Sequence, residues 1–107
     1  MLQSTQACFR ALSDPTRRDI IWLLAGSEMT IGELTDRFDM TRAAVKKHLT
    51  VLSDSGLIEI ERRGRSRVNR LRPHGLQPAI DWLTTLDAFW DARLSDLKRE
   101  IEGERND

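Results

Sequence analysis

The chain has 107 residues, and its 17 lysines and arginines are matched by 17 aspartates and glutamates, so its formal net charge is zero. This length predicts one domain, and 39% hydrophobic with 32% charged residues is typical of a soluble globular protein. With no membrane-length apolar run, no signal-peptide pattern and one cysteine that cannot form an internal disulfide, we expect a cytoplasmic protein without a membrane partner.

Three helices are expected in the first forty residues. Residues 3–12 have helical character with broad apolar faces. Asp14 is suited to cap a second helix, since Pro15 fits a first helical position, where no N–H is needed. Thr30 and Glu33 have the spacing of a capping box, which opens a short third helix that extends to Phe38.

The fourth predicted helix is capped by Thr41 and ended by Gly56. On a helical wheel Val45, Leu49 and Leu52 face the core, while small and basic residues occupy the opposite side. A helix with these two faces is expected of an element that packs on a scaffold and reaches into DNA. Its candidate DNA contacts are Thr41, Arg42, Ala43, Lys46, Lys47, His48 and Thr50.

Residues 57–72 are predicted to form a β-hairpin whose turn uses the conformational freedom of Gly64. The net charge of zero conceals a local excess of positive charge, because residues 41–72 hold nine lysines and arginines and only three acids. The basic hairpin either reaches DNA phosphates or a narrow minor groove, or protects an edge strand by charge. The candidate DNA contacts are Arg62, Arg63, Gly64, Arg65 and Arg67, with Arg65 and Arg67 favoured over Arg62.

The last predicted helix, about residues 76–102, carries two apolar stripes. One stripe follows a spacing of four and three residues from Leu76 to Ile101, with Asp87 as its single polar break, and a second stripe runs beside it. One stripe is enough to pack a helix on its own domain, so two stripes suggest that a partner chain covers the other. The candidate interface residues on this helix are Trp82, Leu86, Phe89, Trp90, Leu94 and Leu97.

The order of four helices, two strands and one helix predicts a mainly α winged helix-turn-helix fold with a β-hairpin wing. A single domain spans residues 1–107, with the helix-turn-helix at about 30–55, the wing at about 57–72 and the dimerisation helix at about 76–102. The sequence contains no catalytic arrangement and no glycine-rich phosphate loop, so we expect neither an enzyme nor a cofactor.

Two separate motifs resemble the ArsR family of bacterial winged-helix repressors. They are Ala-Leu-Ser-Asp-Pro-Thr-Arg-Arg at residues 11–18, and residues 41–52 followed by Gly-Leu-Ile at 56–58. The resemblance implies a homodimer joined through the first and last helices, which would place Cys8 and Phe9 at the interface. It also implies repression of transcription by two recognition helices that bind double-stranded DNA at a near-palindromic operator.

The chain departs from the metal-sensing members of that family. Those members carry a Cys-x-Cys pair in the helix before the recognition helix, or Asp and His ligands on the last helix. Residues 31–38 contain no cysteine, and residues 76–102 contain no histidine. We therefore expect a regulator that does not respond to metal, and no residue pattern identifies an inducer. The alternatives are a metal or redox sensor with an unrecognised site, and a winged-helix protein-interaction module.

Overall fold

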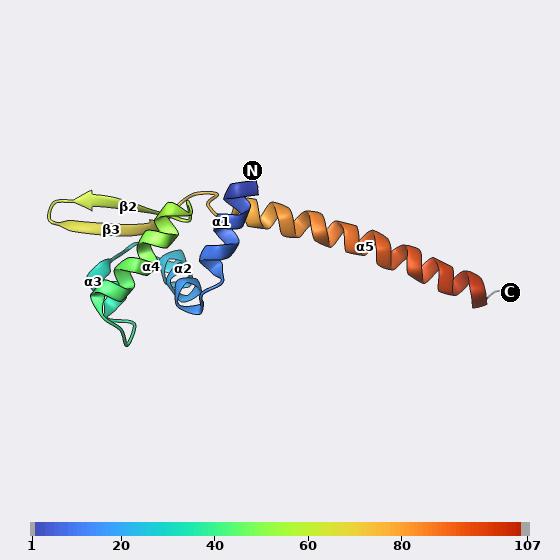
Figure 1. Ribbon diagram of the computed structural model, residues 1–107, viewed down its shortest axis with the longest axis horizontal. Coiled ribbons are helices and arrows are strands. Elements are labelled where there is room, and N and C mark those ends of the chain that lie inside the picture. Colours follow the sequence, from blue (N-terminus) through green and yellow to red (C-terminus); the bar gives the residue numbers. More distant parts are fainter. Residues whose placement is uncertain (1, 106–107) are drawn as a thin grey trace.

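The computed structural model describes residues 2–105, so residues 1, 106 and 107 of the predicted domain lie outside the described part. The expected order of helices and hairpin strands is confirmed (Figure 1). One short strand is added before the third helix. The elements are α1 (Leu2–Leu12), α2 (Pro15–Gly26), β1 (Met29–Thr30), α3 (Ile31–Thr35), α4 (Arg42–Asp54), β2 (Ile58–Arg63), β3 (Ser66–Leu71) and α5 (Gln77–Arg105).

The predicted helix caps are present. The carboxylate of Asp14 and the hydroxyl of Thr41 each accept a hydrogen bond from the backbone N–H three residues later, both at 3.1 Å. Thr30 and Glu33 form the reciprocal capping box, at 3.0 and 3.2 Å between donor and acceptor. These bonds satisfy N–H groups that have no partner within the helix, so α2, α3 and α4 begin at defined residues. Because α3 ends at Thr35, it is shorter than predicted.

Strand β1 was not predicted, and it turns the hairpin into a three-stranded antiparallel sheet with the order β1-β3-β2. Met29 pairs with Asn69 and Thr30 with Val68. The side-chain amide of Asn69 also donates to the carbonyl of Met29 at 3.2 Å. Because β3 is the central strand, the adjacent residues Val68 and Asn69 are both buried. The strand therefore lacks a regular alternation of buried and exposed residues.

A single core lies where α1, α2, α3 and α4 meet the sheet and the first turn of α5. Cys8 belongs to this core and has no exposed surface, which corrects its assignment to a dimer interface. A side chain fully buried within one chain offers no surface to a second copy. The most deeply buried residues of the core are Cys8, Ala11, Ile20, Leu34, Val45, Leu52, Leu57 and Ile58.

Helix α5 leaves this core and extends alone (Figure 1). The chain measures 74 × 29 × 21 Å, and its radius of gyration of 19.9 Å exceeds the roughly 13 Å of a compact domain of this length. Ala79 is buried against the domain, but every residue from Ile80 to Gly103 is exposed. No described helix, α5 included, is long and apolar enough to cross a membrane.

Candidate nucleic-acid interface

Helix α4 presents the two faces that its sequence predicts. Val45, Leu49 and Leu52 are buried and hold the helix against α2, α3 and the sheet. The side chains on the opposite face are exposed, and none of them packs into the core. These exposed residues are Thr41, Arg42, Ala43, Lys46, Lys47 and Thr50.

A groove of about 520 Å³ separates this face of α4 from the wing. Five predicted contact residues line it, Arg42, Lys46 and Thr50 from α4 and Arg65 and Arg67 from the hairpin. Among residues 4–103, whose side chains the structure describes, none of these four cations forms an ion pair. Uncompensated positive charges that face one groove attract a polyanion. The residues 30–32, at the start of α3, close one end of the groove.

Besides residues 30–32 and the core residue Leu49, three groove residues were not identified as site residues from the sequence. Ile60 and Asn69 are directly paired across β2 and β3, and Ser66 begins β3. Asn69 is only 2% exposed, and its side-chain oxygen has no hydrogen-bond partner among the described residues. The pairing of Ile60 with Asn69 could have been inferred from the register of the hairpin. No pattern in the neighbouring sequence indicated that this pair faces α4.

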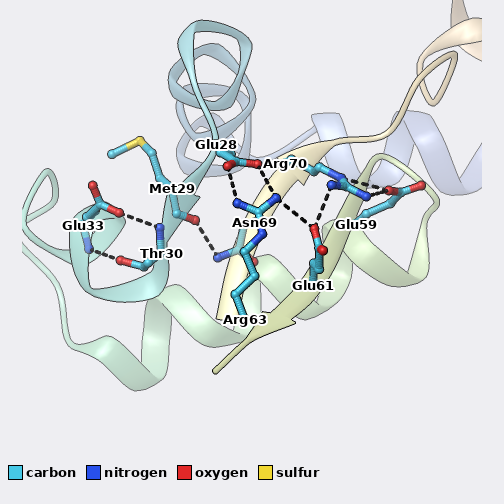
Figure 2. Close-up of polar contacts among 9 residues, drawn as sticks. All are labelled: Glu28, Met29, Thr30, Glu33, Glu59, Glu61, Arg63, Asn69 and Arg70. Atoms are coloured by element: carbon cyan, nitrogen blue, oxygen red, sulfur yellow. Dashed lines mark hydrogen bonds and ion pairs between the residues drawn. The ribbon is translucent and has the colours of Figure 1, made fainter. Parts of the chain in front are cut away.

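The wing also contains arginines that are held within the protein (Figure 2). Arg63 donates to Glu28 at 3.2 Å and to Glu61 at 3.0 Å, while Arg70 donates to Glu61 at 2.8 Å and to Glu59 at 3.0 Å. The hydrogen bond from Arg63 lowers the pKa of Glu28, and the two carboxylates raise the pKa of Arg63. The guanidinium of Arg63, one of the predicted wing contacts, is therefore already bound by two acids.

His48, one of the predicted DNA contacts, lies at the edge of the buried face of α4. Its side chain is half-buried, and its Nδ1 lies 3.4 Å from Arg17 Nη1 and 4.0 Å from Asp14 Oδ1. Arg17 in turn donates through Nε to the carbonyl of Ala11 at 2.6 Å. His48 thus links the recognition helix to the junction between α1 and α2, which suits a residue that supports the orientation of α4.

The predicted interface residues of α5 form a continuous exposed apolar surface. Among the described residues, Trp82 is the one side chain of α5 with an aromatic partner on another element, since its ring meets Phe9 of α1 edge-on with 5.5 Å between centroids. The large side chains are each between 36% and 58% exposed. They are Ile80, Trp82, Leu83, Leu86, Phe89, Trp90, Leu94, Leu97 and Ile101.

Helix α3, the connection at residues 36–41 and the outward-facing helix α4 are thus backed by a sheet. The hairpin of this sheet carries Arg65 and Arg67, which form no ion pair among the described residues. This combination defines a winged helix-turn-helix DNA-binding protein.

Comparison with known proteins leads to the same class of protein. The HTH-type transcriptional regulator Rv2034 of Mycobacterium tuberculosis is 35% identical over 105 residues, which cover 98% of this chain and 95% of that protein. An ArsR-like transcriptional regulator from Rhodococcus sp. RHA1 superposes with a TM-score of 0.77 and 32% identity, covering 90% of this chain and 91% of that one. The chain therefore belongs to the ArsR family of winged helix-turn-helix transcriptional regulators, which are DNA-binding proteins and not enzymes.

Two further comparisons agree with this assignment. The family model described as a helix-turn-helix domain matches residues 12–61. The transcriptional repressor SdpR of Bacillus subtilis is 36% identical over 75 residues, which cover 70% of this chain and 83% of that protein.

Proposed function

We propose that this protein is a homodimeric transcriptional repressor that binds a near-palindromic operator. The observation that carries the proposal is the groove between α4 and the wing, where Arg42, Lys46, Arg65 and Arg67 converge without acidic partners among the described residues. Helix α4 enters the major groove, and the wing follows the adjacent backbone. A protein-docking surface is depleted of charge at its centre, so this basic groove favours DNA over a protein partner.

The residues of the groove divide between base and phosphate contacts. Arg42 stands in the first turn of α4, where recognition helices meet base edges, and its guanidinium can donate two hydrogen bonds to a guanine. Ala43 beside it is small enough for contact with a thymine methyl group. Arg65 and Arg67 lie on the wing and contact phosphates. Lys46 and Lys47 of α4 help to fix the position of the protein along the DNA duplex.

Selection of bound duplexes from a random pool tests this function. We expect two related half-sites in inverted orientation, one helical turn or a multiple of it apart, because each recognition helix of a dimer reads one half-site. Binding to the selected duplex should weaken steeply as the salt concentration rises. Absence of duplex binding at low salt, or an affinity that is independent of salt, would contradict the proposal.

The exposed apolar surface of α5 supports the homodimer. Large apolar side chains that are about half exposed from Ile80 to Ile101 mark a surface that another chain covers. A helix with such a surface is stable only when a second apolar face packs on it. The proposed partner is a second copy of the chain. This copy also supplies the second recognition helix that a palindromic operator requires.

A comparison of two wing arginines tests which wing cations contact DNA and which are held by acids of the protein. We expect Arg65→Ala to weaken operator binding and to reduce the dependence of log K on log salt by about one unit, since one phosphate contact is lost. Arg63→Ala is the matched control, because Arg63 is held by Glu28 and Glu61. Its salt dependence should stay close to that of the parent in fluorescence-anisotropy titrations. Equal slopes for the two variants would contradict this division of the wing.

We further propose that metal ions do not switch DNA binding. The residues of α3 include no cysteine, and α5 carries no histidine. The one thiol, Cys8, is fully buried, and burial raises its pKa, which disfavours the thiolate that binds soft metals. We expect operator affinity to change less than about twofold when Zn²⁺ is added in equimolar amount or removed by a chelator. Release of the operator by one equivalent of Zn²⁺ in the same titration would contradict this proposal.

A further inference from the structure

The wing has a second face, which is turned away from the groove. Ile60 of β2 and Asn69 of β3 line the groove, and successive residues of a strand point to opposite faces of a sheet. The residues that alternate with this pair therefore lie on the far side, which we call the outer face of the wing. Its charged residues are Glu59, Glu61, Arg63 and Arg70.

Five charged side chains bind one another in a row across the outer face (Figure 2). The row alternates acids with arginines, and its three acids and two arginines give it a formal charge of −1. On the groove side, by contrast, Arg65 and Arg67 form no ion pair among the described residues. The groove face is therefore the face of the wing that attracts phosphates. In order, the members of the row are Glu28, Arg63, Glu61, Arg70 and Glu59.

The side chain of Arg63 is drawn back from the tip of the wing. Arg63 ends β2 and pairs with Ser66, so its backbone lies beside the turn. Glu28 immediately precedes β1, which pairs with β3 at residues 68 and 69, further from the tip. To bind Glu28, the guanidinium must therefore extend toward the body of the domain. Arg65 lies two residues further along the chain and lines the groove instead.

Glu28 is the acid on which the position of Arg63 depends most. An isolated exposed ion pair contributes little, but here two guanidinium nitrogens bind the two oxygens of Glu28 within a larger network. The hydrogen bond from Arg63 lowers the pKa of Glu28, so this carboxylate stays charged at neutral pH. Glu61 binds Arg63 at 3.0 Å, but it also accepts a hydrogen bond from Arg70 at 2.8 Å. Without Glu28, Arg63 would keep one acid that is already shared.

We propose that Glu28 is a specificity-determining residue, which holds Arg63 away from DNA and thereby limits binding to random sequences. Non-specific binding is supplied by cations that neutralise phosphates, so each additional free arginine strengthens it. On random DNA no base contacts fix the orientation of the protein, and a released Arg63 can reach a phosphate. On the operator the base contacts of α4 direct the groove face toward the duplex. This inference rests on the proposed DNA-binding function and adds a residue that controls the ratio of operator binding to random binding.

Glu28→Gln tests this role, because it keeps the size of the side chain and removes its charge. We expect the affinity for a random duplex to rise about fivefold at low salt, and the dependence of log K on log salt to steepen by about one unit. Affinity for the selected operator should change less than about twofold, so the ratio of the two affinities falls. Fluorescence-anisotropy titrations of both duplexes measure these values.

Two controls separate the release of Arg63 from a change in net charge. The double variant Glu28→Gln/Arg63→Ala has the net charge of the parent and no arginine to release, so its random-duplex affinity and salt dependence should return to the parent values. Asp19→Asn removes one acid from an exposed position of α2, and Asp19 forms no ion pair with any residue whose side chain is described. It should leave the salt dependence unchanged.

The outcomes distinguish this inference from the proposed function. A Glu28→Gln protein with the salt dependence of the parent on random DNA would overturn the inference, whether or not its affinity changes, and would leave the DNA-binding function intact. A steeper dependence that persists without Arg63, or that Asp19→Asn reproduces, would overturn it in the same way. A parent protein that binds neither duplex would overturn the proposed function, and the inference with it.

Discussion

Trp90→Asp is expected to convert the dimer into monomers and to lower operator affinity by at least about 100-fold. Trp90 is 54% exposed in the single chain and lies in the middle of the exposed apolar surface of α5, so the proposed partner covers it. The substitution removes this burial from both chains, at about 25 cal/mol per Å² of apolar surface. It also brings a second carboxylate to the level of Asp87. Each effect favours separated chains, and a monomer holds only one half-site.

Light scattering and circular dichroism together measure this outcome. The monomer should keep its helical signal, because Trp90 contacts no part of the core and its aromatic partner is the neighbouring Phe89. Ser95→Asp places the same charge on the same helix but outside the apolar stripes, so it should remain dimeric. A Trp90→Asp protein that scatters as a dimer would contradict the α5 interface.

Elements whose geometry is set locally could be predicted from the sequence. Asp14, Thr30 and Thr41 sit at helix starts because each satisfies a nearby N–H group, and that requirement is visible in a window of four residues. The buried and exposed faces of α4 follow from the helical period alone. The contact between Trp82 and α1 could not be predicted from the local sequence, because it depends on the angle at which α5 leaves the domain.

Features that depend on contacts between distant residues could not be predicted. Strand β1 has two residues, too few to show a period, and it exists because β3 offers it an edge. The ion pair between Glu28 and Arg63 joins residues 35 apart and follows from the position of β1. The sequence indicated Arg63 as a cation of the wing, but it did not indicate which cations remain free. The burial of Cys8 likewise depends on how α1 packs against α5.

The connection between the wing and α5 leads to a second large expected effect. Gly75 lies in this connection, and a Cβ atom there would stand 2.7 Å from the carbonyl oxygen of Gly56, 3.1 Å from Leu57 Cα and 3.2 Å from the carbonyl oxygen of Arg72. All three are backbone atoms, which cannot turn aside as a flexible side chain does. Gly56 follows Ser55, the C-cap of α4, and has a positive φ of 79°, so the connection packs against the end of the recognition helix.

Gly75→Ala is therefore expected to lower the free energy of unfolding by about 1–3 kcal/mol, the usual cost of inserting a methyl group into a packed site. The strain falls between the end of α4 and the start of α5, so the chain that still folds should also bind its operator more weakly. Gly26→Ala is the matched control, because no atom lies within 4 Å of its Cβ position and alanine is the better helix former. Urea unfolding of both variants checks the prediction, and equal midpoints would show that the connection yields without strain.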